Sequence, residues 1–241
     1  MAVAESALEQ AESWLAEGRR LALATVIRTW GSSPRPAGSQ LVVSREGDFA
    51  GSVSGGCGEG SVSSESAEVM DSGAPKRLHF GVTDEMAWEV GLACGGEVEI
   101  YIEKLETGSE FLGRVRAQAT ARRGAVRIVH LPSGRDWVLA GNRREAEGVP
   151  EEVLGRVPEA SRSDASTVAT AGGEDFFLHV LNPPPRVVIV GAVHIAQHLG
   201  PMAAAAGFEV VVVDPRASFA TPERFPGMEI CLLYTSDAAD E

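Results

Sequence analysis

The stretch that decides the fold is Arg186-Val-Val-Ile-Val190, followed by Gly191-Ala-Val-His-Ile-Ala196, a run suited to a helix as far as Ala206, and Glu209-Val-Val-Val-Val-Asp214. Two short runs of β-branched residues are thus separated by a glycine turn and one helix. The stretch therefore predicts a strand–turn–helix–strand unit, in which ligands bind at the turn.

This unit has the pattern of the first unit of a Rossmann fold. Gly191 takes the turn position of the glycine fingerprint, and Asp214 ends the second strand, where a carboxylate binds a ribose. Val193 replaces the second glycine, where a side chain obstructs the close approach of a pyrophosphate, and Ala196 replaces the third, where alanine is tolerated. Gly191 and Asp214 are therefore candidate residues for NAD(P) or another nucleotide.

A second glycine-rich stretch, far upstream, carries a lone cysteine: Gly51-Ser-Val-Ser-Gly-Gly-Cys57-Gly-Glu-Gly60. Residues 61–70 contain no glycine or proline and predict a helix, which places Cys57 at or just before a helix N-terminus. Unpaired N–H groups and the helix dipole favour an anion there and ease the loss of the thiol proton. Gly55 and Gly56 allow a ligand close to the backbone. The stretch predicts a site for an anionic ligand that also binds sulfur.

A second cysteine, Cys94, stands with Gly95 and Gly96 in a connection between a short helical stretch (84–91) and an alternating strand (97–103). Functional residues concentrate in such connections. The alternative for both Cys57 and Cys94 is a structural role, because free cysteine is commonly a small buried side chain.

The segment Gly31-Ser-Ser-Pro-Arg-Pro-Ala-Gly38 offers hydroxyl groups and one guanidinium to a ligand. Its prolines and glycines exclude regular structure. A predicted hairpin of residues 40–45 and 48–53 leads from it to the cysteine turn, so we expect the two to be neighbours. Ser32, Ser33 and Arg35 are candidate contacts for an anion, with an ordinary turn as the alternative.

Composition restricts the class of protein. The chain has 241 residues, 44% of them hydrophobic, which allows one large or two modest domains. A formal net charge of −13 argues against nucleic acid as a partner. Three cysteines without zinc-like pairing indicate a reducing compartment. No window of about 18 apolar residues predicts a membrane span, and the N-terminus does not resemble a signal peptide, so we expect a cytoplasmic protein.

Together, four motifs in order across about residues 20–216 resemble the xanthine dehydrogenase accessory factor family, XdhC/CoxI. They are Gly31–Gly38, Gly51–Cys57, Gly91-Leu-Ala-Cys-Gly-Gly96, and the Rossmann-like unit that ends in Val213-Asp-Pro-Arg216. The resemblance implies a maturation factor that binds molybdenum cofactor (molybdopterin) and delivers its sulfurated form to an apo molybdenum hydroxylase such as xanthine or carbon monoxide dehydrogenase. Such a protein is a cofactor-insertion chaperone, not an enzyme. A cysteine desulfurase is a further implied partner, and a homodimer an implied assembly.

The resemblance assigns the cysteine roles to Cys57 and Cys94, both candidate contacts for molybdenum with the choice between them open, and the glycine-turn role to Gly191 with Asp214. This agrees with the chemistry of the residues, because molybdopterin ends in a phosphate and its metal suits soft thiolate ligands.

The expected fold class is α/β. It comprises an N-terminal α+β domain with a mixed sheet and cofactor-handling role (1–140), a linker (141–174) that includes a helical patch at 150–154, and a truncated Rossmann-like domain (175–241). The tail from about Cys231 resembles a translated sequencing adapter, so Cys231 is assigned no function.

Two alternatives stay open. An NAD(P)-dependent oxidoreductase is supported by the Rossmann-like unit and Asp214, and opposed by Val193 and by the lack of an evident acid–base set. A nucleotide-sensing binding module, in which the cysteines are structural, is the third interpretation.

Overall fold

The computed structural model describes residues 7–56, 58–81, 96–140 and 146–233. The chain divides into two compact units: one comprises Glu5–Asn182, and the second begins at Pro183. Each unit has its own hydrophobic core. No helix in the described ranges is long and apolar enough to cross a membrane.

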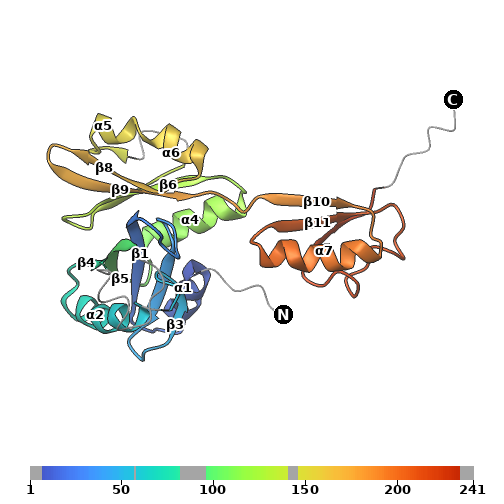
Figure 1. Cartoon of the computed structure of the whole chain (residues 1–241), viewed down its shortest axis with the longest axis horizontal. Coiled ribbons are helices and arrows are strands. Elements are labelled where there is room, and N and C mark those ends of the chain that lie inside the picture. Colours follow the sequence, from blue (N-terminus) through green and yellow to red (C-terminus); the bar gives the residue numbers. More distant parts are fainter. Residues whose placement is uncertain (1–6, 57, 82–95, 141–145, 234–241) are drawn as a thin grey trace. The chain divides into compact units, whose positions relative to one another are not determined.

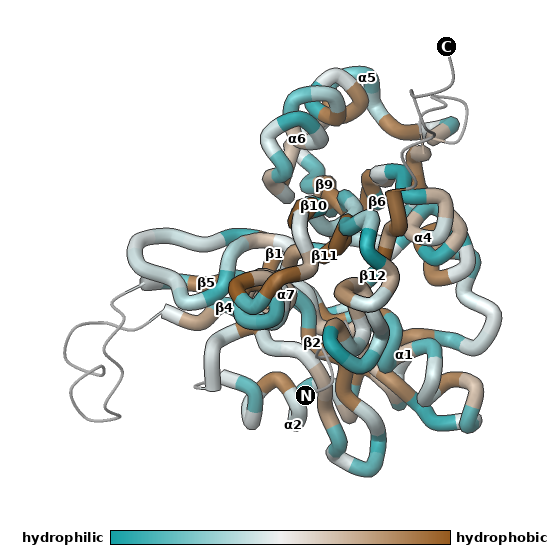
Figure 2. Tube along the Cα trace, turned by 90° about the vertical axis from the view of Figure 1, so that its right-hand side faces the viewer, coloured by the Kyte–Doolittle hydropathy of each residue, from teal (hydrophilic) through white to brown (hydrophobic). Residues whose placement is uncertain are grey.

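The first sheet of the N-terminal unit is antiparallel, with the order β3-β2-β1-β5-β4. Its elements are β1 (Leu21–Trp30), β2 (Gln40–Ser44), β3 (Phe49–Gly51), β4 (Lys76–Gly81) and β5 (Glu97–Leu105), with α1 (Ala7–Ala16) and α2 (Glu59–Ser72) packed on it. The first seven residues of β1 are all buried, because helices and the second sheet cover both of its faces. In Figure 2 the hydrophobic colour accordingly follows β1 and β6.

The second sheet of this unit is also antiparallel, with the order β7-β6-β9-β8. Its elements are β6 (Ala125–His130), β7 (Asp136–Leu139), β8 (Thr167–Ala171) and β9 (Glu174–Leu181), with α4 (Glu110–Thr120), α5 (Glu151–Leu154) and α6 (Val157–Ser163). Helices α5 and α6 cover one face of it (Figure 1), with Val153 and Leu154 in the same core as Ile128 and Leu178. Every pair of described strands in these two sheets is antiparallel, whereas the sequence predicted a mixed sheet.

Two segments are placed differently from the sequence-based expectation. The predicted linker contains α5, α6 and β8, and β9, which was expected to open the C-terminal domain, pairs with β6 and β8. The elements are short and polar on their outer sides, so no sustained period marks them. The helical patch predicted at 150–154 is confirmed by α5. A further local signal was Gly172-Gly173, both at positive φ, which form the two-residue turn of the β8–β9 hairpin. The division into functional domains at 1–140, 141–174 and 175–241 stays a prediction.

The C-terminal unit confirms the Rossmann-like prediction. β10 (Arg186–Val190), α7 (His194–Ala205), β11 (Glu209–Val213) and β12 (Glu229–Cys231) form a parallel sheet in the order β10-β11-β12, with the helix packed on it. Ile189 and Val212 pack against Ala196 and Ala203 of α7. The α/β fold class is therefore confirmed.

Candidate functional site

The turn around Cys57 brings the chain from β3 into α2. Cys57 itself lies outside the described residues, but both of its flanks are described. Gly55 and Gly56 have φ of 74° and 114°, a region that glycine adopts without strain. Helix α2 begins at Glu59, two residues earlier than the sequence predicted, and Gly58 is its N-cap residue. The predicted position of the cysteine turn at a helix start is thus confirmed for its flanks.

The carboxylate of Glu59 occupies the anion position that the sequence assigned to a ligand. It accepts hydrogen bonds from the hydroxyl of Ser52 (2.8 Å), the hydroxyl and N–H of Ser54 (3.1 Å for the N–H), the N–H of Gly56 (3.0 Å) and the N–H of Gly58 (3.2 Å). The N–H of Gly55 donates to Ser52 Oγ at 3.0 Å. The amides of Gly55 and Gly56 are therefore already paired within the turn, and an external phosphate would have to displace Glu59.

These hydrogen bonds set the ionisation of Glu59. Burial alone raises the pKa of its carboxyl group, but the hydroxyls of Ser54 and Ser52 and the N–H of Ser54 outweigh burial and lower the pKa to about 2. Glu59 is therefore ionised at neutral pH, and its negative charge is fixed at the cysteine turn.

Three of the predicted segments converge on one another. A Cβ added to Gly55 would lie 3.3 Å from Pro34 Cβ, so the cysteine turn packs against the 31–38 loop. A Cβ added to Gly96 would lie 2.4 Å from the carbonyl oxygen of Ser32, so the chain just after the second cysteine packs against the same loop. Cys94 and Gly95 lie outside the described residues. The predicted proximity of the loop and the cysteine turn is confirmed, and Gly96 joins them.

The polar groups of the 31–38 loop differ in availability. The hydroxyl of Ser33 donates to the carbonyl oxygen of Arg35 at 3.0 Å and so stabilises the loop itself. Ser32 and Arg35 are exposed, and within the described part of the chain the Arg35 guanidinium has no ion pair. The loop ends at Gly38, whose carbonyl oxygen lies 3.2 Å from Nε2 of the buried His179. Ser32 and Arg35 are thus the polar groups of this loop that face solvent.

His179 holds this loop on the second sheet as a neutral side chain. Burial, reinforced by the nearby positive charge of Arg127, lowers the pKa of His179 to about 3, against the opposing effect of the Gly38 carbonyl. The neutral ring therefore donates its Nε2 proton to Gly38. An alanine at Gly38 would also approach Ser166 Oγ to 2.7 Å, so the end of the loop is tightly fitted.

In the C-terminal unit, the residues of the Rossmann turn interact with one another. Gly191 has φ of 106°, and Val193, at the N-cap of α7, has 44% of its surface exposed. Asp214 is buried and accepts hydrogen bonds from the N–H of Ala192 (2.8 Å) and from Nε and Nη2 of Arg216 (2.9 and 2.8 Å). These contacts, that of the Arg216 side chain foremost, hold the pKa of Asp214 well below its usual range. A ribose would have to displace Arg216, so this residue set does not fit NAD(P) as it stands.

Sequence reasoning missed three residues of these sites: Glu59, His179 and Arg216. For Glu59, the signal in the sequence was a glutamate just before a predicted helix, a few residues after Ser52 and Ser54. For Arg216, the signal was an arginine two residues after Asp214, close enough to pair with it. Nothing local marked His179, because its burial depends on packing between the two sheets. No group of three or more His, Cys, Asp or Glu side chains within the described ranges could hold a metal ion.

Two curated proteins are similar to this chain in sequence. It is 24% identical over 225 residues to a probable xanthine dehydrogenase subunit of Bacillus subtilis (strain 168), which is 89% of this chain and 66% of that protein. It is 33% identical over 99 residues to "Molybdenum cofactor insertion chaperone PaoD" of Escherichia coli (strain K12), which is 41% of this chain and 30% of that protein. The chain thus spans at most about two thirds of the length of these relatives.

A solved structure and two family models complete the comparison. A crystal structure described as a xanthine dehydrogenase from Bacillus halodurans superposes with a TM-score of 0.74 at 21% identity, over 95% of this chain and 68% of that one, which shows a shared fold. The model of the XdhC and CoxI family matches residues 14–81, and that of the XdhC Rossmann domain matches residues 187–241. One model thus matches in each unit, so both units of this chain are similar to the XdhC and CoxI family.

Proposed function

We propose that this chain is an accessory factor that binds molybdenum cofactor as its cargo and delivers the sulfurated form to a molybdenum hydroxylase such as xanthine or carbon monoxide dehydrogenase. The similarity of both units to the XdhC and CoxI family supports this, as does a relative named as a molybdenum cofactor insertion chaperone. The observation that carries the proposal is the packing of the 31–38 loop against both Gly55 and Gly96, because these glycines are close in sequence to Cys57 and Cys94. The chain acts as a carrier and not as an enzyme.

The cargo offers two kinds of group, and the site has residues suited to each. Thiolates of Cys57 and Cys94 are soft ligands suited to molybdenum and its sulfido group. For the phosphate we propose Arg35 and the hydroxyl of Ser32, since both are exposed in the shared loop, whereas the amides of Gly56 and Gly58 donate to Glu59. Glu59 would then shape the cysteine turn instead of binding the cargo.

The test compares three single variants: Cys57→Ala, Cys94→Ala and, as the matched control, Cys231→Ala in the C-terminal unit. Each is purified from cells that make molybdenum cofactor, and the bound pterin is quantified by fluorescence after oxidation and referred to protein concentration. We expect the first two to retain less cofactor than the wild type, while Cys231→Ala retains the same amount. Equal retention by all four proteins, with unchanged circular dichroism, would remove the thiols from the mechanism.

The same proposal includes partners. A molybdenum hydroxylase in its apo form is the recipient, and a cysteine desulfurase is the source of the sulfur. A homodimer is the proposed assembly of the carrier. Co-elution of each purified partner with this chain, in the presence and absence of cofactor, tests these assignments one at a time. Incubation with NAD(P) in parallel tests the nucleotide alternative, for which the pairing of Asp214 with Arg216 predicts no binding.

A further inference from the structure

Positive charge is concentrated in one segment of this acidic chain. Residues 111–135 contain six arginines and no aspartate or glutamate, although the whole chain has a net charge of −13. One of the six, Arg127, is buried and paired with Glu103 and Asp136. The other arginines lie on α4, on the turn that follows it and just before β7. A cluster of positive charge on a chain with a negative net charge indicates a surface that binds a negatively charged partner.

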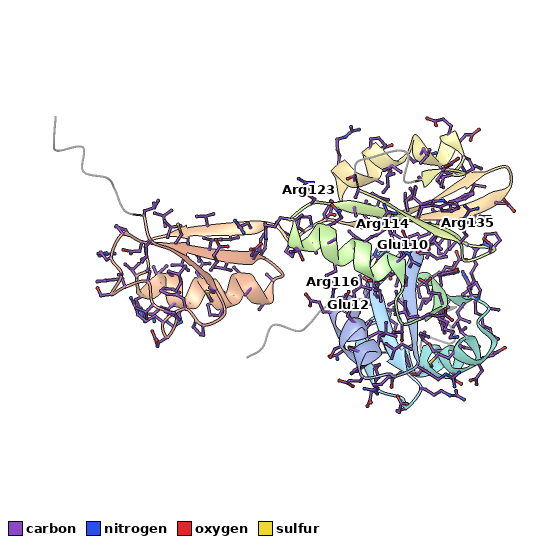
Figure 3. All side chains as sticks on the ribbon, turned by 180° about the vertical axis from the view of Figure 1, so that it is seen from behind. Glu12, Glu110, Arg114, Arg116, Arg123 and Arg135 are labelled. Carbon is purple, nitrogen blue, oxygen red and sulfur yellow. The ribbon has the colours of Figure 1, made fainter. Side chains whose placement is uncertain are left out.

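Four of these arginines define what we call the basic face: Arg114, Arg116, Arg123 and Arg135. Figure 3 shows Arg123 at one end of α4, Arg114 toward the other end, and Arg116 beside Glu12 of α1. Phe111 and Leu112 bury the opposite side of the helix in the core.

The outer side of α4 between the arginines is smooth. Gly113, Ala117 and Thr120 are exposed there, and apart from its chain neighbours and the backbone of α4 itself no atom lies within 4 Å of the place where a Cβ on Gly113 would be. Arg114 and Arg116, two residues apart on a helix, point to opposite sides of this strip. A partner segment that lies along the strip would therefore meet guanidinium groups on both sides.

Two arginines of the basic face form weak ion pairs with nearby carboxylates. Arg114 lies 3.6 Å from Glu110, and Arg116 lies 3.7 Å from Glu12. One side chain of each pair is largely exposed, Glu110 at 86% and Arg116 at 70%, whereas Arg114 and Glu12 are 32% and 28% exposed, so each pair contributes little to stability. In the described part of the chain, Arg123 and Arg135 have no carboxylate partner at all.

A cavity of about 240 Å³ lies beside this face, between the first turn of α4 and β7. Arg114, Arg135 and Trp137 line it, together with Phe111, Val138 and the carboxylates Glu110 and Asp136. The Arg135 guanidinium lies 4.7 Å from the centre of the Trp137 ring, and Trp137 Nε1 donates to the carbonyl oxygen of Glu147 at 3.0 Å, which fixes the ring. Trp and Arg around a pocket are the residue types that dominate the energy of protein interfaces.

We propose that the basic face binds an acidic segment of a partner protein, with one side chain of that segment in the cavity beside Trp137. Arg114 lies toward the start of α4 and Arg123 just beyond its end, and an 11-residue helix is about 16 Å long at 1.5 Å per residue, which is too far for one small anion to reach all four arginines. The net charge of −13, together with Glu12 and Glu110 within the face, disfavours the continuous phosphate track of a nucleic acid.

The experiment uses a fluorescent helical peptide of about 20 residues, long enough to fold in part, with glutamates along one side, and a second peptide with glutamines in their place. Fluorescence anisotropy measures the binding of each to the full chain. The double variant R116Q/R123Q is compared with R156Q/R162Q, which removes the same charge from exposed positions on and beside α6. The single variant R135Q tests the cavity.

We expect saturable binding of the glutamate peptide that weakens as salt concentration rises, because exposed ion pairs are screened. R116Q/R123Q and R135Q should each weaken it by about fivefold, and R156Q/R162Q by less than about twofold. The proposal would be overturned if the two double variants lost the same affinity for the glutamate peptide, or if the glutamine peptide bound the wild type as tightly as the glutamate peptide does. So would tighter binding of duplex DNA, or self-association of the wild type that R116Q/R123Q abolishes, which would assign the face to a second copy.

Discussion

The hydroxyl of Ser52 donates to the carboxylate of Glu59 at 2.8 Å, and this bond ties the end of β3 to the first residue of α2. Ser54 and the N–H groups of Gly56 and Gly58 bind the same carboxylate, so one side chain organises the whole turn around Cys57. An internal anion therefore replaces the external one that a helix N-terminus favours.

The first prediction concerns Glu59→Gln. The amide keeps the size of the side chain but loses the charge that strengthens these bonds, so we expect the free energy of unfolding at neutral pH to fall by about 1–2 kcal/mol. Urea unfolding followed by tryptophan fluorescence measures it. The N-terminal unit alone is monitored, because Trp14, Trp30, Trp88 and Trp137 all belong to it.

The same variant carries a pH signature. The pKa of Glu59 falls from its ordinary value of 4.5 to about 2 on folding, so its ionised form stabilises the fold above pH 4.5. This stability is lost as the pH falls from 4.5 to 2. The difference between wild type and Glu59→Gln should therefore shrink over that window, and a constant difference would show that ionisation of Glu59 contributes nothing.

The second prediction compares two glycines of the N-terminal unit. A Cβ on Gly96 would lie 2.4 Å from the backbone oxygen of Ser32, so Gly96→Ala must displace the 31–38 loop and should cost about 1–3 kcal/mol. Apart from its chain neighbours and the backbone of α2 itself, Gly60, in the first turn of α2, has no atom within 4 Å of the corresponding position, and Gly60→Ala should stabilise the unit by about 0.5–1 kcal/mol. Gly96→Ala should also release bound molybdenum cofactor, which Gly60→Ala should retain.

Local sequence predicted those elements whose pattern is complete within one segment. The run Leu21–Ile27 is apolar at every position except Thr25 and forms the central strand, and the two valine-rich runs around Gly191 form adjacent parallel strands. Tight packing of the loop against Gly96 was not predicted, because a close approach between distant backbones leaves no local pattern. The same limit hid α6, whose buried residues face a strand that is more than ten residues away in sequence.

Candidate residues were predictable by type but not by pairing. The sequence identified Asp214 as a carboxylate at a strand end, which is correct, but not that Arg216 would bind both of its oxygens. It identified the glycines around Cys57, but not that their amides would donate to Glu59. In both cases, a group that could bind a ligand is instead paired with a residue nearby in the sequence. Residue types alone do not distinguish these two outcomes, whereas the structure does.

The third prediction concerns the buried Arg127, which joins the two sheets. Its guanidinium binds Glu103 of β5 at 2.8 Å and Asp136 of β7 at 2.6 Å, and it stacks on Phe111 at 3.8 Å. Arg127→Met leaves two carboxylates without their cation, so we expect a loss of about 3–5 kcal/mol in urea unfolding. Adding Glu103→Gln to Arg127→Met should recover part of the loss, since one uncompensated charge is removed.

A surface change provides the control for this prediction. Arg162, exposed at the end of α6, should change stability by less than about 0.5 kcal/mol when replaced by methionine. A loss for Arg127→Met as small as that for Arg162→Met would show that the buried ion cluster does not hold the sheets together.

The last prediction rests on His179, whose neutral ring holds Gly38 at the end of the 31–38 loop. Its pKa falls from 6.5 to about 3 on folding, chiefly through burial, so the unfolded chain binds the proton more tightly. Stability is therefore highest above pH 6.5 and falls by up to about 1.4 kcal/mol per pH unit below it. His179→Gln keeps a donor for Gly38 but does not titrate, so it should abolish this slope between pH 6.5 and 4.5, before most carboxylates titrate. Parallel stability curves for the two proteins over that window would mean that His179 is not buried as a neutral group, and the loop would then need another anchor.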